Sequence, residues 1–110
     1  MEITIKDVQV AKVIELVGDL DGSTAPEAQA KILPLAEPGV KIILDMSAVA
    51  YMSSAGLRML LVLYRSIAGS GGKVLLVGLS SELEDTMQLT GFLDFFDHYA
   101  TMDDGIAAIA

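Results

Sequence analysis

Two short, continuous apolar segments constrain the fold of this chain more than any other feature of its sequence. The first, residues 40–45, follows Gly39 and ends in an aspartate, and the second, residues 73–78, follows the sequence Gly-Ser-Gly-Gly. A strand that is buried on both faces of a sheet has this pattern, because neither of its faces contacts water. A helix predicted over residues 55–68 separates the two segments. We therefore expect parallel strands joined by a right-handed crossover.

The remaining strand signals complete an α/β pattern. Apolar runs at residues 2–8 and 12–18 flank a polar turn and predict an antiparallel hairpin, and residues 95–99 predict a short last strand. We expect a mixed, mostly parallel sheet of about five strands with about four helices, and with the hairpin at one edge. No linker, repeat or low-complexity tract interrupts the pattern, so residues 1–110 are predicted to form a single domain.

Capping motifs predict where three of the helices begin. Thr24 precedes Glu27 by three residues and Ser81 precedes Glu84 by three, which is the spacing of a capping box. In such a box the hydroxyl accepts a hydrogen bond from the helix, and the glutamate reaches back to the backbone of the capping residue. Thr101 is expected to begin a short terminal helix.

Composition excludes several classes of function. Fifteen acidic and seven basic side chains give a net charge of −8, which repels nucleic acid and anionic lipid. A protein partner with a basic face is the better match, although acidity also serves solubility alone. The absence of cysteine excludes disulfides and thiolate metal sites and suits a reducing compartment. The charged N-terminus is unlike a signal peptide, and the longest apolar stretch, residues 57–64, contains Arg58 and is too short to span a bilayer. We expect a cytoplasmic protein that does not insert into membranes.

Catalytic and cofactor motifs are not found. His98 is the only histidine, and the serines at 53 and 54 lack the flanking glycines of a nucleophile elbow. The glycine-rich segment 69–72 follows a helix and precedes a strand, the wrong order for a phosphate-binding loop. We expect a protein that is not an enzyme and holds neither a cofactor nor a metal.

The start of the middle helix carries the most information about function. Residues 51–57 read Tyr-Met-Ser-Ser-Ala-Gly-Leu, so Ser53 and Ser54 lie where helix N–H groups lack partners. Simple capping would explain one of these serines. Arg58 and Arg65 are seven residues apart and share one stripe of an otherwise apolar helix. That helix is expected to be covered by a neighbour, to dock a partner, or both.

These segments resemble the anti-sigma factor antagonists, which are single-domain bacterial members of the STAS family. The signature of the family is similar to residues 51–57, and three further segments match it in order and spacing. They are Gly-Asp-Leu-Asp at 18–21 followed by Thr24, Leu-Asp-Met-Ser at 44–47, and Thr-Gly-Phe at 90–92 followed by Phe96. The resemblance extends over essentially the whole chain and implies the STAS fold.

The resemblance also implies a partner switch. The unphosphorylated form would bind an anti-sigma factor that is also a serine kinase of the GHKL ATPase type, and would thereby release the sigma factor. Phosphorylation at Ser54 would abolish that binding, and a metal-dependent serine phosphatase would restore it. Ser53 stands where the family often has aspartate and is a secondary candidate for phosphorylation. The partner-binding residues implied are Asp21, Thr24, Ser53, Ser54, Gly56 and Arg58.

An alternative stays open within the same fold. Similar modules serve as non-phosphorylated docking or ligand-binding subunits, for example on the ATPase of a lipid ABC transporter. The two serines favour the phosphorylated switch without excluding this alternative.

Overall fold

A five-stranded sheet forms the centre of the protein in the computed structural model, which describes all of residues 1–110. Its strands lie in chain order across the sheet: β1 (Glu2–Val8), β2 (Ala11–Val17), β3 (Lys41–Ala48), β4 (Lys73–Val77) and β5 (Asp97–Tyr99). β1 pairs with β2 in antiparallel fashion, and every other neighbouring pair is parallel. The predicted fold class and the position of the hairpin at one edge are confirmed.

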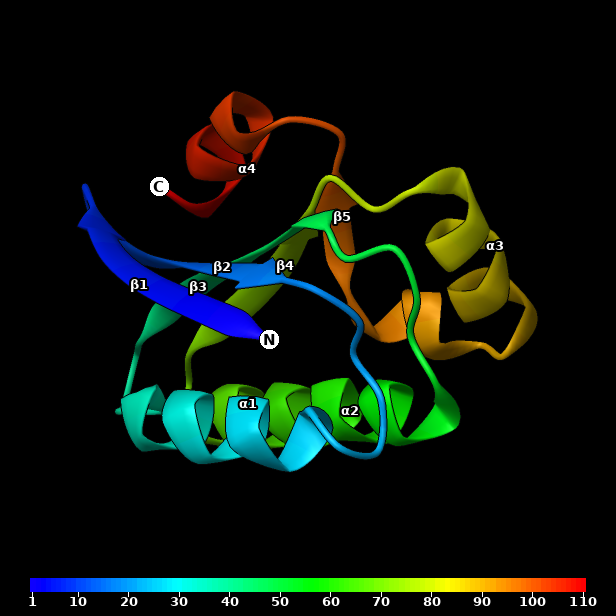
Figure 1. Cartoon of the computed structure of the whole chain (residues 1–110). Coiled ribbons are helices and arrows are strands. Elements are labelled where there is room, and N and C mark those ends of the chain that lie inside the picture. Colours follow the sequence, from blue (N-terminus) through cyan, green and yellow to red (C-terminus); the bar gives the residue numbers. More distant parts are fainter.

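Helices cover both faces of the sheet unequally. They are α1 (Ala25–Ile32), α2 (Ser54–Gly69), α3 (Ser81–Leu89) and α4 (Met102–Ile109), with 3₁₀ turns at Leu33–Leu35 and Phe92–Phe95. α1 and α2 lie along one face, and α4 lies alone on the other (Figure 1). None of these helices is long and apolar enough to cross a membrane.

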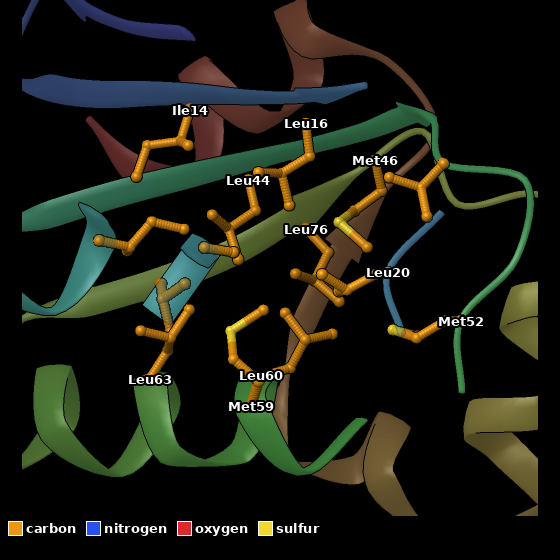
Figure 2. Packing of buried hydrophobic residues seen from close by; sticks show 14 of the residues in the cluster. Ile14, Leu16, Leu20, Leu44, Met46, Met52, Met59, Leu60, Leu63 and Leu76 are labelled. Atoms are coloured by element: carbon orange, nitrogen blue, oxygen red, sulfur yellow. The ribbon is translucent and has the colours of Figure 1, made fainter. Parts of the chain in front are cut away.

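The main core lies between the sheet and helices α1, α2 and α3. It contains 21 buried residues, and apolar side chains of β3 and β4 face those of α2 within it (Figure 2). Ile43 points to the opposite face, where α4 covers a smaller cluster. Because Ile42, Ile43 and Leu44 all have no exposed surface, β3 is buried on both faces, as its continuous apolar sequence predicts.

The capping box predicted for α1 is wrong. Thr24 does occupy the N-cap position, but its side chain forms no capping hydrogen bond. Its hydroxyl donates to the carbonyl oxygen of Asp19 at 2.8 Å and accepts from the N–H of Asp21 at 2.9 Å. Oε1 of Glu27 lies 3.8 Å from Nζ of Lys31, one turn along the helix, so the glutamate does not bond to the backbone of Thr24 as a capping box requires. The threonine is therefore used to close the preceding loop.

The start of α3 differs from its prediction by one residue. Ser80 is the N-cap, and its hydroxyl accepts from the N–H of Leu83 at 3.1 Å, so Ser81 is already helical. The cap predicted for α4 is confirmed, since Thr101 accepts from the N–H of Asp104 at 3.2 Å. β5 begins at Asp97, two residues later than expected, because Phe95 belongs to the preceding 3₁₀ turn, Phe92–Phe95.

Candidate functional site

Two loops meet where the parallel strands end and α2 begins. The loop that follows β2 contains Leu20, and the loop that follows β3 contains Tyr51, Met52 and Ser53. The N–H of Leu20 donates to the carbonyl of Tyr51 at 2.9 Å, and the N–H of Ser53 donates to the carbonyl of Leu20 at 2.9 Å. Leu20 and Met52 thus form an isolated parallel bridge. This edge is where open α/β sheets place their functional groups.

Gly56 allows α2 to begin close to the first loop. A Cβ atom at this position would lie 2.6 Å from the carbonyl oxygen of Leu20 and 2.8 Å from Cγ of Met52. Both distances are shorter than real Cβ atoms adopt, so only glycine fits without a shift of the backbone. Gly56 is itself buried. It can therefore influence a partner only by setting the positions of its neighbours.

The two serines at the start of α2 have different environments. Ser53 is half-buried and is the N-cap, with its hydroxyl 3.4 Å from the N–H of Gly56. Ser54 is exposed, is the first residue of the helix, and its hydroxyl has no hydrogen-bond partner in the protein. Of the two, Ser54 is the one with a hydroxyl that is free to meet another molecule.

Asp21 is held in place by its own loop. Its Oδ1 atom accepts hydrogen bonds from the hydroxyl of Ser23 at 2.8 Å, from the N–H of Ser23 at 2.9 Å and from the N–H of Thr24 at 3.1 Å. These bonds, that of the Ser23 hydroxyl first, lower the pKa of the Asp21 carboxyl below its ordinary value. The carboxylate therefore stays charged and oriented at neutral pH.

The structure brings most of the predicted site residues together. The loop of Asp21 and Thr24 is bonded to the segment that carries Ser53 and begins α2. One turn further along the helix, exposed Arg58 lines a groove with Gly22, the neighbour of Asp21. The hydroxyl of Thr24 is already used by its loop.

Tyr51 was missed from the sequence. It lies in the loop before the serines and is 55% exposed, although it is a large aromatic residue. Because an unburied aromatic side chain is enriched at protein interfaces, it belongs with the candidate site. No signal in the sequence distinguished it, because the same loop also contains Val49 and Met52, which are apolar and buried.

Groups typical of catalysis do not gather at this site. Nδ1 of His98 lies 4.0 Å from Oε1 of Glu84, and no serine hydroxyl bonds to the imidazole. No group of three or more histidine, aspartate or glutamate side chains is arranged to hold a metal ion. What the site offers is a surface: an oriented carboxylate, a free hydroxyl, an exposed aromatic ring and a guanidinium.

Known proteins resemble this chain over nearly its full length. The sequence model of the STAS domain matches residues 2–105. The anti-sigma-B factor antagonist of Bacillus subtilis is 31% identical over 93 residues, which cover 84% of this chain and 85% of that protein. The crystal structure of an anti-sigma factor antagonist from Mycobacterium paratuberculosis is 27% identical, with a TM-score of 0.86 over 98% of this chain and 92% of that one. The Bacillus protein SpoIIAA in its phosphorylated form shares the fold at 22% identity, with a TM-score of 0.76 over 99% of this chain and 100% of that one. The family predicted from the sequence is confirmed: the chain belongs to the STAS domain family.

Proposed function

We propose that this protein is an anti-sigma factor antagonist whose activity is switched by phosphorylation of Ser54. The unphosphorylated form binds an anti-sigma factor that is also a serine kinase of the GHKL type, and so frees the sigma factor. A metal-dependent serine phosphatase reverses the modification, and all of these steps take place in the cytoplasm. The observation that carries the proposal is the exposed, unbonded hydroxyl of Ser54, in a chain 31% identical to an anti-sigma-B factor antagonist.

The environment of Ser54 suits a phosphate. The first N–H groups of a helix have no partners inside the helix, and the helix dipole places partial positive charge there. A phosphate on the first residue of α2 would face these groups. The fold should therefore tolerate a modification that adds about −1.5 to −2 charges at neutral pH.

The same phosphate would disfavour a partner that covers the site. The partner would have to desolvate a dianion on a surface that also carries the carboxylate of Asp21, which is charged at neutral pH. A loss of about 3–4 kcal/mol in binding free energy would weaken the complex by roughly two to three orders of magnitude. No change in the conformation of the protein is needed.

The serine that acts as the cap is the weaker candidate for phosphorylation. The hydroxyl of Ser53 accepts from the backbone of Gly56 and is half-buried. A kinase would have to break that cap before it could reach the oxygen. We therefore place the phosphate on Ser54, with Ser53 as the secondary site.

Intact-mass measurement tests the proposal directly. The protein and its Ser53→Ala and Ser54→Ala variants are each incubated with ATP and with the purified GHKL-type anti-sigma factors of its own genome. We expect one added phosphate on the wild type and on Ser53→Ala, and none on Ser54→Ala. A phosphate that persists in Ser54→Ala and disappears in Ser53→Ala would move the switch to Ser53.

A binding measurement tests the consequence for the partner. Ser54→Ala should bind the anti-sigma factor as the wild type does, and Ser54→Asp should bind more weakly, although one carboxylate copies a phosphate poorly. Equal affinity of the two variants would remove Ser54 from the mechanism. No phosphate on any form, together with stable binding to a transporter ATPase, would favour the non-phosphorylated docking subunit instead.

A further inference from the structure

An open groove runs between α1 and α2 beside Ser54. Its volume is about 760 Å³, and we call it the α1–α2 groove. One wall comes from α1, the turn after it and the loop before it, namely Gly22, Ala25, Pro26, Gln29, Ala30, Leu33 and Pro34. The other wall comes from α2, namely Ala55, Arg58, Met59 and Val62. The two helices lie next to each other on one face of the sheet (Figure 1).

Small residues and helical spacing explain why the groove is hollow and apolar. The four α2 residues are spaced i, i+3, i+4 and i+7, so they form one stripe on the helix. Ala25 and Met59 are buried, while Ala30 is exposed and Val62 is 41% exposed. Alanines on the α1 side leave space that longer side chains would fill. The result is an apolar hollow that opens to solvent instead of a closed core contact.

The groove continues the surface proposed to meet the anti-sigma factor. Ala55, which follows Ser54, lies in one wall, and Gly22, which follows Asp21, lies in the other. A stable interface buries about 800 Å² on each partner, so a partner that covers Ser54 also covers neighbouring surface. The other two hollows of the surface contain no residue of these loops. Of the three hollows, the α1–α2 groove is therefore the one that adjoins Ser54.

The charge of the groove indicates which kind of partner group can bind in it. Arg58 is the only charged residue in its walls, and it takes part in none of the three ion pairs of the protein. A free guanidinium on a chain of net charge −8 is the complement of a carboxylate, not of a basic group. Asp21, in the loop that is hydrogen-bonded to the segment before α2, is the complement of a basic group. Opposite charges in the groove and in this loop would fix the orientation of a partner.

We propose that the α1–α2 groove receives apolar side chains of the anti-sigma factor, together with a carboxylate of the same partner that pairs with Arg58. The inference rests on the proposed function and adds a second contact region to it. It also gives phosphorylation a second effect. Arg58 follows Ser54 by four residues, so a phosphate on the serine would compete with the partner's carboxylate for the same guanidinium.

Paired variants on α2 test the groove without touching Ser54. Val62→Glu places a charge in the groove, whereas Ala68→Glu places the same charge on an exposed position of the same helix outside it. Arg58→Ala removes the groove cation, and Arg65→Ala removes the other exposed arginine of α2. Ala30→Glu repeats the test from the α1 wall. Titration calorimetry with the purified anti-sigma factors of its own genome measures the dissociation constants, and circular dichroism checks that every variant is folded.

We expect the three groove variants to weaken binding by roughly tenfold or more, and Ala68→Glu and Arg65→Ala to remain within about twofold of the wild type. Groove variants that bind as tightly as their controls, while Ser54→Asp binds weakly, would overturn this inference and leave the proposed function intact. A wild-type protein that binds none of the anti-sigma factors would overturn the proposed function, and the groove inference with it.

Discussion

Replacing Gly56 by alanine should destabilise this protein, although alanine is the better helix former by about 1 kcal/mol. The new Cβ would lie 2.6 Å from the carbonyl oxygen of Leu20 and 2.8 Å from Cγ of Met52. That carbonyl accepts the hydrogen bond from the N–H of Ser53, so it cannot move away freely. Overpacking of this kind costs about 1–3 kcal/mol, and a weakened hydrogen bond adds about 1 kcal/mol. We expect a net loss of about 1–3 kcal/mol in the free energy of unfolding.

Urea unfolding followed by circular dichroism measures this loss, and the same helix provides a control. Gly69 is the last residue of α2, and a Cβ there would meet no atom within 4 Å. Gly69→Ala should therefore leave the urea midpoint unchanged or raise it slightly. A loss of about 1 kcal/mol would lower the melting temperature of a domain of this size by roughly 4–8 °C.

The comparison of the two alanine variants decides whether the reasoning holds. If Gly56→Ala is as stable as Gly69→Ala, the close approach of α2 to the loop of Leu20 does not constrain residue 56. A Gly56→Ala variant that is destabilised but still phosphorylated at the wild-type rate would show that residue 56 affects the stability of the fold without affecting phosphorylation. It would show that the spacing of the two loops matters for the fold alone.

Three further changes have defined outcomes. Because hydrogen bonds lower the pKa of the Asp21 carboxyl below 3.8, they stabilise the native state above that pH and are lost as the pH falls through the lowered value. The difference in urea midpoint between the wild type and Asp21→Ala should therefore shrink as the pH is lowered from about 6 to about 3, and a constant difference would contradict this. Leu63→Ala should cost about 2–5 kcal/mol in urea unfolding, because Leu63 has no exposed surface; a cost below about 1 kcal/mol would show that the core collapses around the missing atoms. Thr101→Ala should cost about 1 kcal/mol and speed amide hydrogen exchange in α4, and unchanged exchange would mean that the cap does not limit this helix.

The strands of the sheet could be predicted because their sequence patterns are strong and occur more than once. The two apolar segments of residues 40–45 and 73–78 could be interpreted as strands because burial on both faces leaves no place for polar residues. Capping was less predictable. Thr24 and Glu27 have the spacing of a capping box, but the threonine hydroxyl is hydrogen-bonded to the backbone of Asp19 and Asp21 instead of capping the helix. A local motif has alternatives that only the path of the neighbouring chain can decide.

The candidate site shows the same division. The resemblance indicated the segment of Ser53 and Ser54 and the loop of Asp21, but it did not show that Gly56 is buried or that Tyr51 is exposed. These properties depend on the distance between two loops that are about 30 residues apart in the chain. Short-range sequence patterns carry no information about that distance.

The sequence by itself determined the alternation of strands and helices, the hairpin at one edge and the family to which the chain belongs. These follow from local periodicity and short motifs, which each segment carries independently. The tertiary structure decided which serine caps α2 and which is free, because the start of α2 is set by its contact with Leu20. It also decided that α1 and α2 leave an apolar groove with a single cation, Arg58, since a groove exists only when two helices have been packed side by side.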